Sequence, residues 1–93
     1  MSRKPRPPIR IYIDILRVVR GEGGRARPTR ILYGANLSYE RMQRYLAELT
    51  SKQLLKEEKE GDVTYYILTE KGYSFLSEYE KFEKLAKAFG FTL

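Results

Sequence analysis

The chain has 93 residues, of which 42% are hydrophobic, and its formal net charge at pH 7 is +6. This size suits one small domain, and no apolar run approaches the roughly 20 residues that span a bilayer. Histidine and cysteine are both missing, which excludes disulfides, zinc sites built on these ligands and catalysis by a histidine dyad. The basic start of the chain lacks the long apolar region of a signal peptide. We therefore expect a cytoplasmic protein with neither a cofactor nor a membrane partner.

The positive charge is concentrated in the first half of the chain. Residues 1–50 hold 11 Lys and Arg against 4 Asp and Glu, whereas residues 51–93 hold 7 against 8. All ten arginines lie at or before position 44. A surface composition of the thermophile type would mix the charges along the whole chain. The uneven distribution instead favours a functional basic surface for nucleic acid.

The first eight residues, MSRKPRPP, contain three prolines and three basic residues. This composition predicts an extended arm over residues 1–8. Two interpretations of the arm remain open: its cations follow the DNA backbone or enter a minor groove, or they only make the chain more soluble. The candidate DNA contacts in the arm are Arg3, Lys4 and Arg6.

The run Ile9–Arg20 is compatible with two secondary structures. Isoleucine at positions 9, 11, 13 and 15 alternates as in a strand, while the apolar positions 9, 12, 13, 16 and 19 follow helical spacing. Its twelve-residue length and the glycine-rich stop at Gly21–Gly24 favour a helix.

Residues Thr29–Leu49, TRILYGANLSYERMQRYLAEL, predict two short helices joined by a tight turn. Pro28 marks the start of the first helix, about Pro28–Gly34. The turn Gly34-Ala35-Asn36 contains residues that end helices or tolerate a left-handed backbone. Ser38 can cap the second helix, which continues to about Ser51. This outline is a helix-turn-helix, in which the second helix is the recognition helix.

The outward face of the recognition helix carries side chains suited to bases and phosphates. Arg44 can make a bidentate contact with guanine, and Gln43 can pair with adenine. Arg41 suits a phosphate, and Tyr39 suits a phosphate or a thymine methyl group. At the start of the preceding helix, free N–H groups and the helix dipole favour an anion. For each residue the alternative is a solvated helix surface. The predicted DNA-binding residues of the two helices are Ser38, Tyr39, Arg41, Gln43, Arg44, Arg27, Thr29 and Arg30.

Two short strands follow, at residues 54–58 and 63–68, with Gly61 as the reversal point between them. The order helix, helix-turn-helix and hairpin predicts a winged helix, an α+β fold that is mostly α, in which the hairpin is a two-stranded wing. The wing tip, residues 57–62, is more acidic than basic. We therefore expect phosphates to repel the wing.

A last helix is predicted from its N-cap Thr69 to about Phe89. Bulky apolar residues recur along it at alternating spacings of 4 and 3 residues, as in a heptad seam. Those in its first turns can pack on the wing domain, but those near its end would form a larger exposed patch than soluble monomers usually tolerate. We therefore favour a dimer contact with a second copy. The predicted dimer residues are Tyr79, Phe82, Leu85, Ala86 and Phe89.

The flank of this helix offers two favourable i,i+4 ion pairs, Glu80 with Lys84 and Glu83 with Lys87. The chain as a whole divides into a basic arm at residues 1–8, a winged helix-turn-helix domain at 9–72, and a dimerisation helix with its tail at 73–93.

Several motifs resemble those of the small dimeric archaeal winged-helix DNA-binding proteins, a group that includes abundant chromatin-associated members. Thr29-Arg30-Ile31 with Tyr33 and residues 35–38 match a TRI-Y-ANLS turn, Leu54-Leu55 matches the leucine pair that opens the wing, and residues 68–72 match an LTxKG step into the last helix. The match covers roughly residues 9–85. The resemblance implies a winged-helix fold, antiparallel pairing of the last helices in a dimer, and binding of double-stranded DNA.

The leading functional hypothesis is a homodimeric double-stranded-DNA-binding protein, either a transcription regulator or a nucleoid-associated chromatin-type binder, with each recognition helix in the major groove. A protein-interaction adaptor and an RNA-binding module are the alternatives, although no stacking motif of the RRM or KH type is present. We do not expect an enzyme, because GEGGRAR lacks the lysine and Ser/Thr ending of a P-loop.

Overall fold

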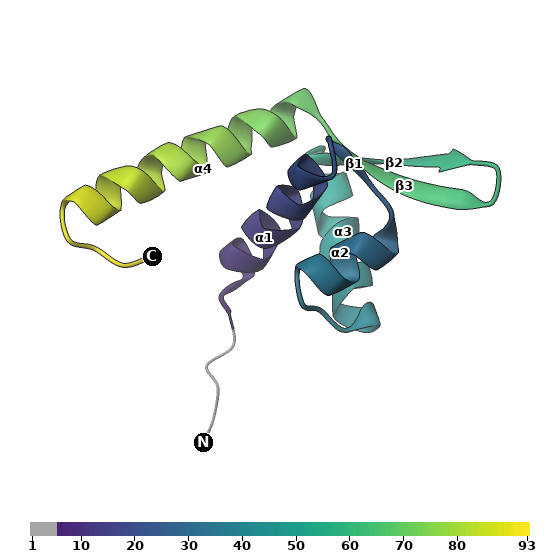
Figure 1. Cartoon of the computed structure of the whole chain (residues 1–93), viewed down its shortest axis with the longest axis horizontal. Helices are drawn as coiled ribbons and strands as arrows, with labels where there is room; N and C mark the ends of the chain where they lie inside the picture. Colours follow the sequence, from purple (N-terminus) through teal and green to yellow (C-terminus); the bar gives the residue numbers. More distant parts are fainter. Residues whose placement is uncertain (1–5) are drawn as a thin grey trace, which may run out of the picture.

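The computed structural model describes residues 6–93, which form four helices and one three-stranded antiparallel sheet (Figure 1). The mostly helical α+β class is confirmed, and so is the order of helix, helix-turn-helix, hairpin and last helix. The division of the chain at residues 8 and 72 stays a prediction. The elements are α1 (Pro8–Gly21), β1 (Arg25–Ala26), α2 (Pro28–Gly34), α3 (Tyr39–Ser51), β2 (Leu55–Glu60), β3 (Val63–Leu68) and α4 (Glu70–Ala88).

The ambiguous run after the arm is a helix, as its length and its glycine-rich end predicted. Pro8 occupies the first turn of α1, where a backbone N–H would have no hydrogen-bond acceptor within the helix, so proline is tolerated there. The helix ends at Gly21, and in the turn that follows, Gly23 and Gly24 take φ values of +85° and +90°, a region open to glycine at little cost. The buried side chains of α1 are Ile11, Ile13, Ile15, Leu16 and Val19.

The predicted helix-turn-helix is present with its turn and its cap. Asn36 has a φ of +54°, and the Leu37 N–H donates to the Leu32 carbonyl at 3.0 Å, which closes the turn after α2. The Ser38 hydroxyl accepts from the N–H of Arg41 at 3.3 Å at the start of α3.

The sheet has one strand more than the predicted wing. Its order is β1-β3-β2, because the short strand β1 pairs with the edge of β3 opposite β2. In the hairpin, Leu55 lies opposite Leu68 and Glu60 opposite Val63, which leaves the two-residue loop 61–62. Gly61 has a φ of +63° there, as a tight hairpin requires.

The LTxKG step has a steric explanation. The Thr69 hydroxyl accepts from the Gly72 N–H at 2.9 Å and donates to the Gln53 carbonyl at 2.7 Å, so it caps α4 and ties it to the connection between α3 and β2. Gly72 is buried, and a Cβ at this position would collide with the Leu54 carbonyl and the Leu68 side chain. Only glycine lets the first turn of α4 lie this close to the chain that enters β2.

The core lies between α1, α2, α3 and the sheet, and only the first half of α4 joins it. Leu76 is fully buried, while Phe75 and Tyr79 pack at the margin of the core. Beyond them α4 extends away from the domain, and the tail after it bends back (Figure 1). The second half of α4 is therefore supported mainly by polar contacts and by its own tail.

Candidate nucleic-acid interface

The exposed face of α3 presents most of the predicted recognition residues. Met42, Leu46 and Leu49 are buried against the core, which leaves Tyr39, Gln43 and Arg44 exposed and Arg41 half-buried. The Arg44 guanidinium lies 5.3 Å from the ring centroid of Tyr45. Ser38 is exposed and serves as the N-cap. Within residues 6–93, neither arginine of α3 forms an ion pair.

The inward side of α3 is fixed to α1. The rings of Tyr12 and Tyr45 meet edge to face with centroids 5.5 Å apart, and the Tyr12 hydroxyl donates to the Glu48 carboxylate. This hydrogen bond, together with burial and the Glu48 charge, raises the pKa of Tyr12 to about 12. The phenol therefore stays a donor at neutral pH, and it holds the outward face of α3 in a set orientation.

The start of α2 adds three exposed side chains, Arg27, Thr29 and Arg30. Arg27 forms no ion pair with any residue of the described part of the chain. Arg30 lies 3.6 Å from Glu22, with 72% of its side chain exposed, so that pair is loose and open to water. All three side chains face solvent and are free to meet a phosphate.

The arginines of α1 are used differently, in a set of contacts that we call the α1–α4 clamp. Arg20 donates to Glu80 at 2.8 and 2.9 Å, and Arg10 donates to Glu83 at 3.2 Å. Arg17 bridges both carboxylates, at 3.1 Å to Glu80 and 2.9 Å to Glu83. The hydrogen bonds from Arg20 and Arg17 lower the pKa of Glu80 to about 2.

The clamp replaces the two predicted ion pairs on the flank of α4. Among residues 6–93, Glu80 and Glu83 form no ion pair with Lys84 or Lys87, because the guanidinium groups of α1 already occupy their oxygens. The clamp also changes the interpretation of the excess of arginine in the first half of the chain. Part of its arginine excess neutralises carboxylates of the second half and does not belong to a nucleic-acid surface.

Arg6, the first described residue of the predicted arm, contacts the domain beside the helix-turn-helix. Arg6 donates to Asp14 of α1 at 2.7 Å and to the carbonyl of Asn36 at 3.1 Å. The structure therefore gives Arg6 contacts within the domain. Arg3 and Lys4 lie outside the described residues, and their contact with DNA stays a prediction.

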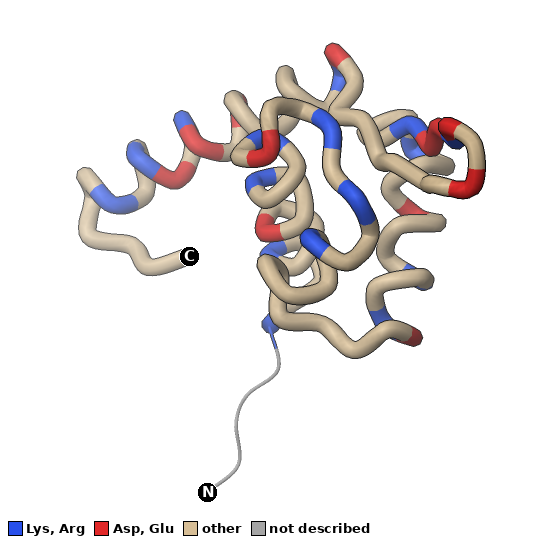
Figure 2. The backbone as a smooth tube through the Cα atoms, turned by 45° about the vertical axis from the view of Figure 1, so that its right-hand side comes forward, with Lys and Arg blue, Asp and Glu red and all other residues tan. Residues whose placement is uncertain are grey.

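The wing carries its charges on two faces. On one face, Arg25 of β1 forms ion pairs with Glu60 and, at 3.9 Å, with Glu58, and its guanidinium lies 3.7 Å from the ring centroid of Tyr65. Figure 2 shows acidic positions gathered around the tip of this hairpin. The predicted acidic wing tip is thus partly neutralised by a residue from a strand that the sequence did not predict.

On the other face of the wing, the Tyr66 hydroxyl donates to Glu57 at 3.0 Å. These two side chains line a hollow of about 210 Å³ together with Gln43, Ala47 and Thr50 of α3. Burial, and then the hydrogen bond to Glu57, raises the pKa of Tyr66 to about 12. Glu57 therefore borders α3, a placement that depends on its pairing with Tyr66 across the hairpin.

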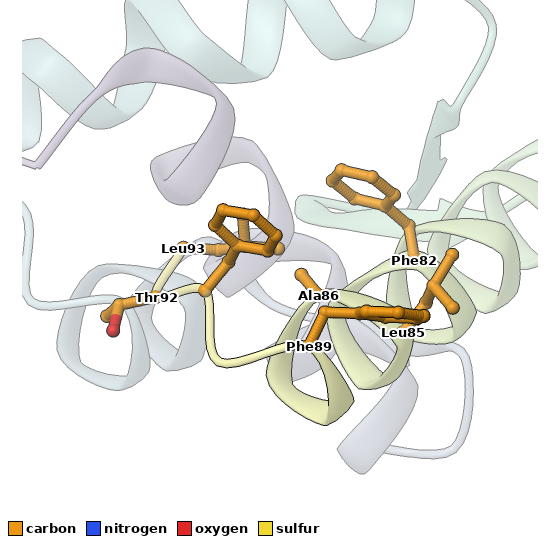
Figure 3. A pocket seen from close by; sticks show the side chains of 7 residues that line it. Phe82, Leu85, Ala86, Phe89, Thr92 and Leu93 are labelled. Carbon is orange, nitrogen blue, oxygen red and sulfur yellow. The ribbon is translucent and has the colours of Figure 1, made fainter.

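The end of α4 forms an apolar surface with the tail. Phe82, Leu85 and Phe89 are 55%, 56% and 73% exposed, and Figure 3 shows them projecting from the helix. Tyr79 is partly buried against the core, and Ala86 is buried. These five are the residues predicted for the dimer contact.

The tail adds two apolar residues that were not predicted from the sequence. Gly90 has a φ of +85°, and the N–H of Phe91 donates to the Ala86 carbonyl at 2.8 Å, so the chain reverses at this point. Phe91 and Leu93 then line a groove of about 450 Å³ with the α4 residues (Figure 3). A glycine directly after the helix, followed by a bulky apolar residue, is the signal that predicts such a reversal.

Other kinds of site find no support in the described residues. Between residues 6 and 93 no helix is long and apolar enough to cross a membrane. Over the same range, no group of acidic side chains is arranged to hold a metal ion.

Comparison with known proteins agrees with this geometry. A family model described as winged helix-turn-helix matches residues 5–87. The chain belongs to this family. Among solved structures, the winged helix is similar to Sso10a-2, a DNA-binding protein from Sulfolobus solfataricus, at 32% identity and a TM-score of 0.78, over 90% of this chain and 85% of that one.

A second similar winged-helix structure is F93 from STIV, described as a winged-helix DNA-binding protein. It shares 27% identity with this chain at a TM-score of 0.72, over 87% of this chain and 95% of that one. The transcriptional regulator BldR from Sulfolobus solfataricus shares the fold at 13% identity and a TM-score of 0.67, over 84% of this chain and 60% of that one. None of the curated proteins matches the chain in sequence. The resemblance to archaeal winged-helix proteins is thereby confirmed.

Proposed function

We propose that this winged helix binds double-stranded DNA as a homodimer, with α3 of each protomer in the major groove, as a transcription regulator or a nucleoid-associated chromatin-type protein. Two related structures support the proposal, because the proteins from Sulfolobus and from STIV are both described as DNA-binding. They share 32% and 27% identity with this chain over most of its length.

One observation carries the proposal: the arginines without an ion pair lie on α3 and at the start of α2. Within the described residues these are Arg27, Arg41 and Arg44, whereas the arginines of α1 and β1 all contact carboxylates. A solvated, unpaired guanidinium releases counterions when it meets a phosphate, and this release supplies much of the affinity for DNA. Gln43 and Arg44 in the middle of α3 have the groups that read base edges.

The proposed dimer contact is the apolar surface at the end of α4. Phe82, Leu85 and Phe89 lie beyond the part of the helix that the core supports, and the tail enlarges their surface with Phe91 and Leu93. A second copy would remove these side chains from water. Two DNA-binding domains held together would also raise affinity through bivalency.

Binding is best tested by fluorescence anisotropy with a random-sequence duplex and matched single-stranded DNA and RNA over a salt series. For about four to six phosphate contacts per dimer, log K should fall with log salt at a slope of about −4 to −5. A flat salt dependence, or tighter binding of RNA, would contradict the proposal. Absence of duplex binding at low salt would favour a protein-interaction adaptor.

A pair of charge-reversal variants locates the contact. Arg41→Glu with Arg44→Glu should weaken duplex binding by about a hundredfold or more, because two phosphate or base contacts become repulsive. Lys81→Glu with Lys84→Glu is the matched control, since it makes the same change in net charge on the solvent side of α4. Equal losses in the two variants would show that net charge, and not α3, accounts for the effect.

A further inference from the structure

We propose that Arg25 of β1 is a positioning residue for the wing. By pairing with Glu58 and Glu60 on one face of the hairpin, it partly neutralises the acidic tip, so that Lys59 on the other face contacts a DNA phosphate. This inference rests on the proposed function. It reverses the expectation that phosphates repel the wing.

The register of the hairpin separates the charges. Successive side chains of a strand point to opposite faces of the sheet. In β2, Glu58 and Glu60 therefore share the face on which Arg25 contacts them. Glu57 and Lys59 share the opposite face, where their cross-strand partners are Tyr66 and Thr64.

The face that bears Lys59 is the one beside the recognition helix. Glu57 and Tyr66 border the same hollow as Gln43 and Ala47, both of which are exposed on α3. A duplex that covers the exposed face of α3 therefore meets this side of the wing. Glu57 is the only acidic residue of β2 on that side, and the Tyr66 hydroxyl already satisfies one of its oxygens.

Arg25 is held in a fixed position on the face of the wing that bears Glu58 and Glu60. β1 pairs with β3 so that Arg25 lies opposite Ile67. The guanidinium covers the ring of Tyr65, whose cross-strand partner is Glu58. The same guanidinium contacts both Glu58 and Glu60. Without it, two exposed carboxylates on one short hairpin would oppose the phosphates that the wing approaches.

A charge-rescue cycle tests the role of Arg25. Duplex affinity is measured by anisotropy for the wild type, Arg25→Gln, Glu58→Gln with Glu60→Gln, and the triple variant. Arg25→Gln should bind duplex about three- to tenfold more weakly than the wild type. The triple variant, which lacks Arg25 and both carboxylates, should return to within about twofold of the wild-type affinity. Glu58→Gln with Glu60→Gln should bind at least as tightly as the wild type. Lys84→Gln controls for the loss of one charge, and circular dichroism monitors folding.

The outcomes separate this inference from the proposed function. A triple variant as weak as Arg25→Gln would mean that Arg25 contacts DNA itself, and a loss no larger than that of Lys84→Gln would mean that it does not act on binding. Either result would overturn the inference alone. Failure of the wild type to bind any duplex would overturn the proposed function as well.

Lys59 and Lys56 form a matched pair on the same strand. They carry the same charge at positions of opposite parity, so the register assigns them to opposite faces. Lys59→Gln should reduce the magnitude of the salt slope by about one for each wing that contacts DNA, while Lys56→Gln should leave it unchanged. Equal effects of the two substitutions would contradict the assignment of the DNA-facing side.

Discussion

The two sides of this molecule use arginine for different purposes. Between α1 and α4, Arg17 and Arg20 are held against carboxylates within 3.1 Å. On α3, Arg41 and Arg44 form no ion pair with any other described residue. The comparison shows that a basic stretch of sequence is not the same as a basic surface, because the partners of each guanidinium are decided by the packing of distant segments.

The difference has an energetic basis. A solvated guanidinium lowers the stability of the folded state little, and its full charge can interact with a phosphate. A guanidinium that contacts two carboxylates in a half-exposed helix junction is already neutralised, and its value lies in fixing the geometry of the junction.

Disruption of the proposed dimer contact at the end of α4 should have the largest effect. Phe82→Glu with Phe89→Glu should produce a monomer in sedimentation at micromolar concentration, because it places charges in the apolar surface. Duplex affinity should fall by about a hundredfold through lost bivalency. Ser77→Glu with Ala88→Glu adds the same charge at exposed positions of α4 outside the groove and should remain a dimer. A wild-type chain that sediments as a monomer would refute this contact.

Loss of the clamp should change stability more than binding. Arg17→Gln with Arg20→Gln leaves Glu80 without its partners and should lower the free energy of unfolding by about 1–2 kcal/mol at fixed protein concentration. Arg41→Gln with Arg44→Gln should change it by less than about 0.5 kcal/mol while weakening DNA binding. Urea denaturation and anisotropy on both variants measure the two quantities. Equal changes in unfolding free energy and in duplex affinity for the two double variants would contradict the division between structural and DNA-binding arginines.

The smallest effect should be a pH dependence assigned to Glu80. The arginines lower its pKa from 4.5 to about 2, so its contribution is present above about pH 4.5 and is lost as the pH falls toward 2. Glu80→Gln should remove about 1 kcal/mol at pH 7, a value reduced by partial solvent screening. It should also flatten the acid limb of stability against pH. An unchanged acid limb in urea titrations between pH 5 and 2 would contradict this assignment.

The helices and the hairpin could be predicted because their signals are local. Pro28, the caps Ser38 and Thr69, and Gly61 each act on neighbouring residues, and the structure has every one of them in its predicted role. The two-residue strand β1 could not be predicted in this way. It exists because β3 has an open edge beside it, and two residues are too few to show alternation.

Contacts between residues that lie far apart in the sequence could not be predicted either. The i,i+4 rule predicted lysine partners for Glu80 and Glu83, but arginines 60 to 66 residues away are closer in the folded chain. The acidic residues of the wing tip likewise could not be assigned to a face of the hairpin from the sequence, because that assignment depends on the register between β2 and β3. Of the candidate site, the sequence identified which side chains of α3 would be exposed, but not which other arginines would be neutralised.

The α1–α4 clamp has a consequence for the DNA that a dimer would recognise. Because the clamp fixes the angle between α4 and the helix-turn-helix, it would also fix the distance between the two α3 helices in the proposed dimer. That distance must match an integral number of helical turns for both helices to enter the same side of a duplex. In the proposed dimer, three arginines remote from the bases would thus determine the spacing between the two DNA half-sites.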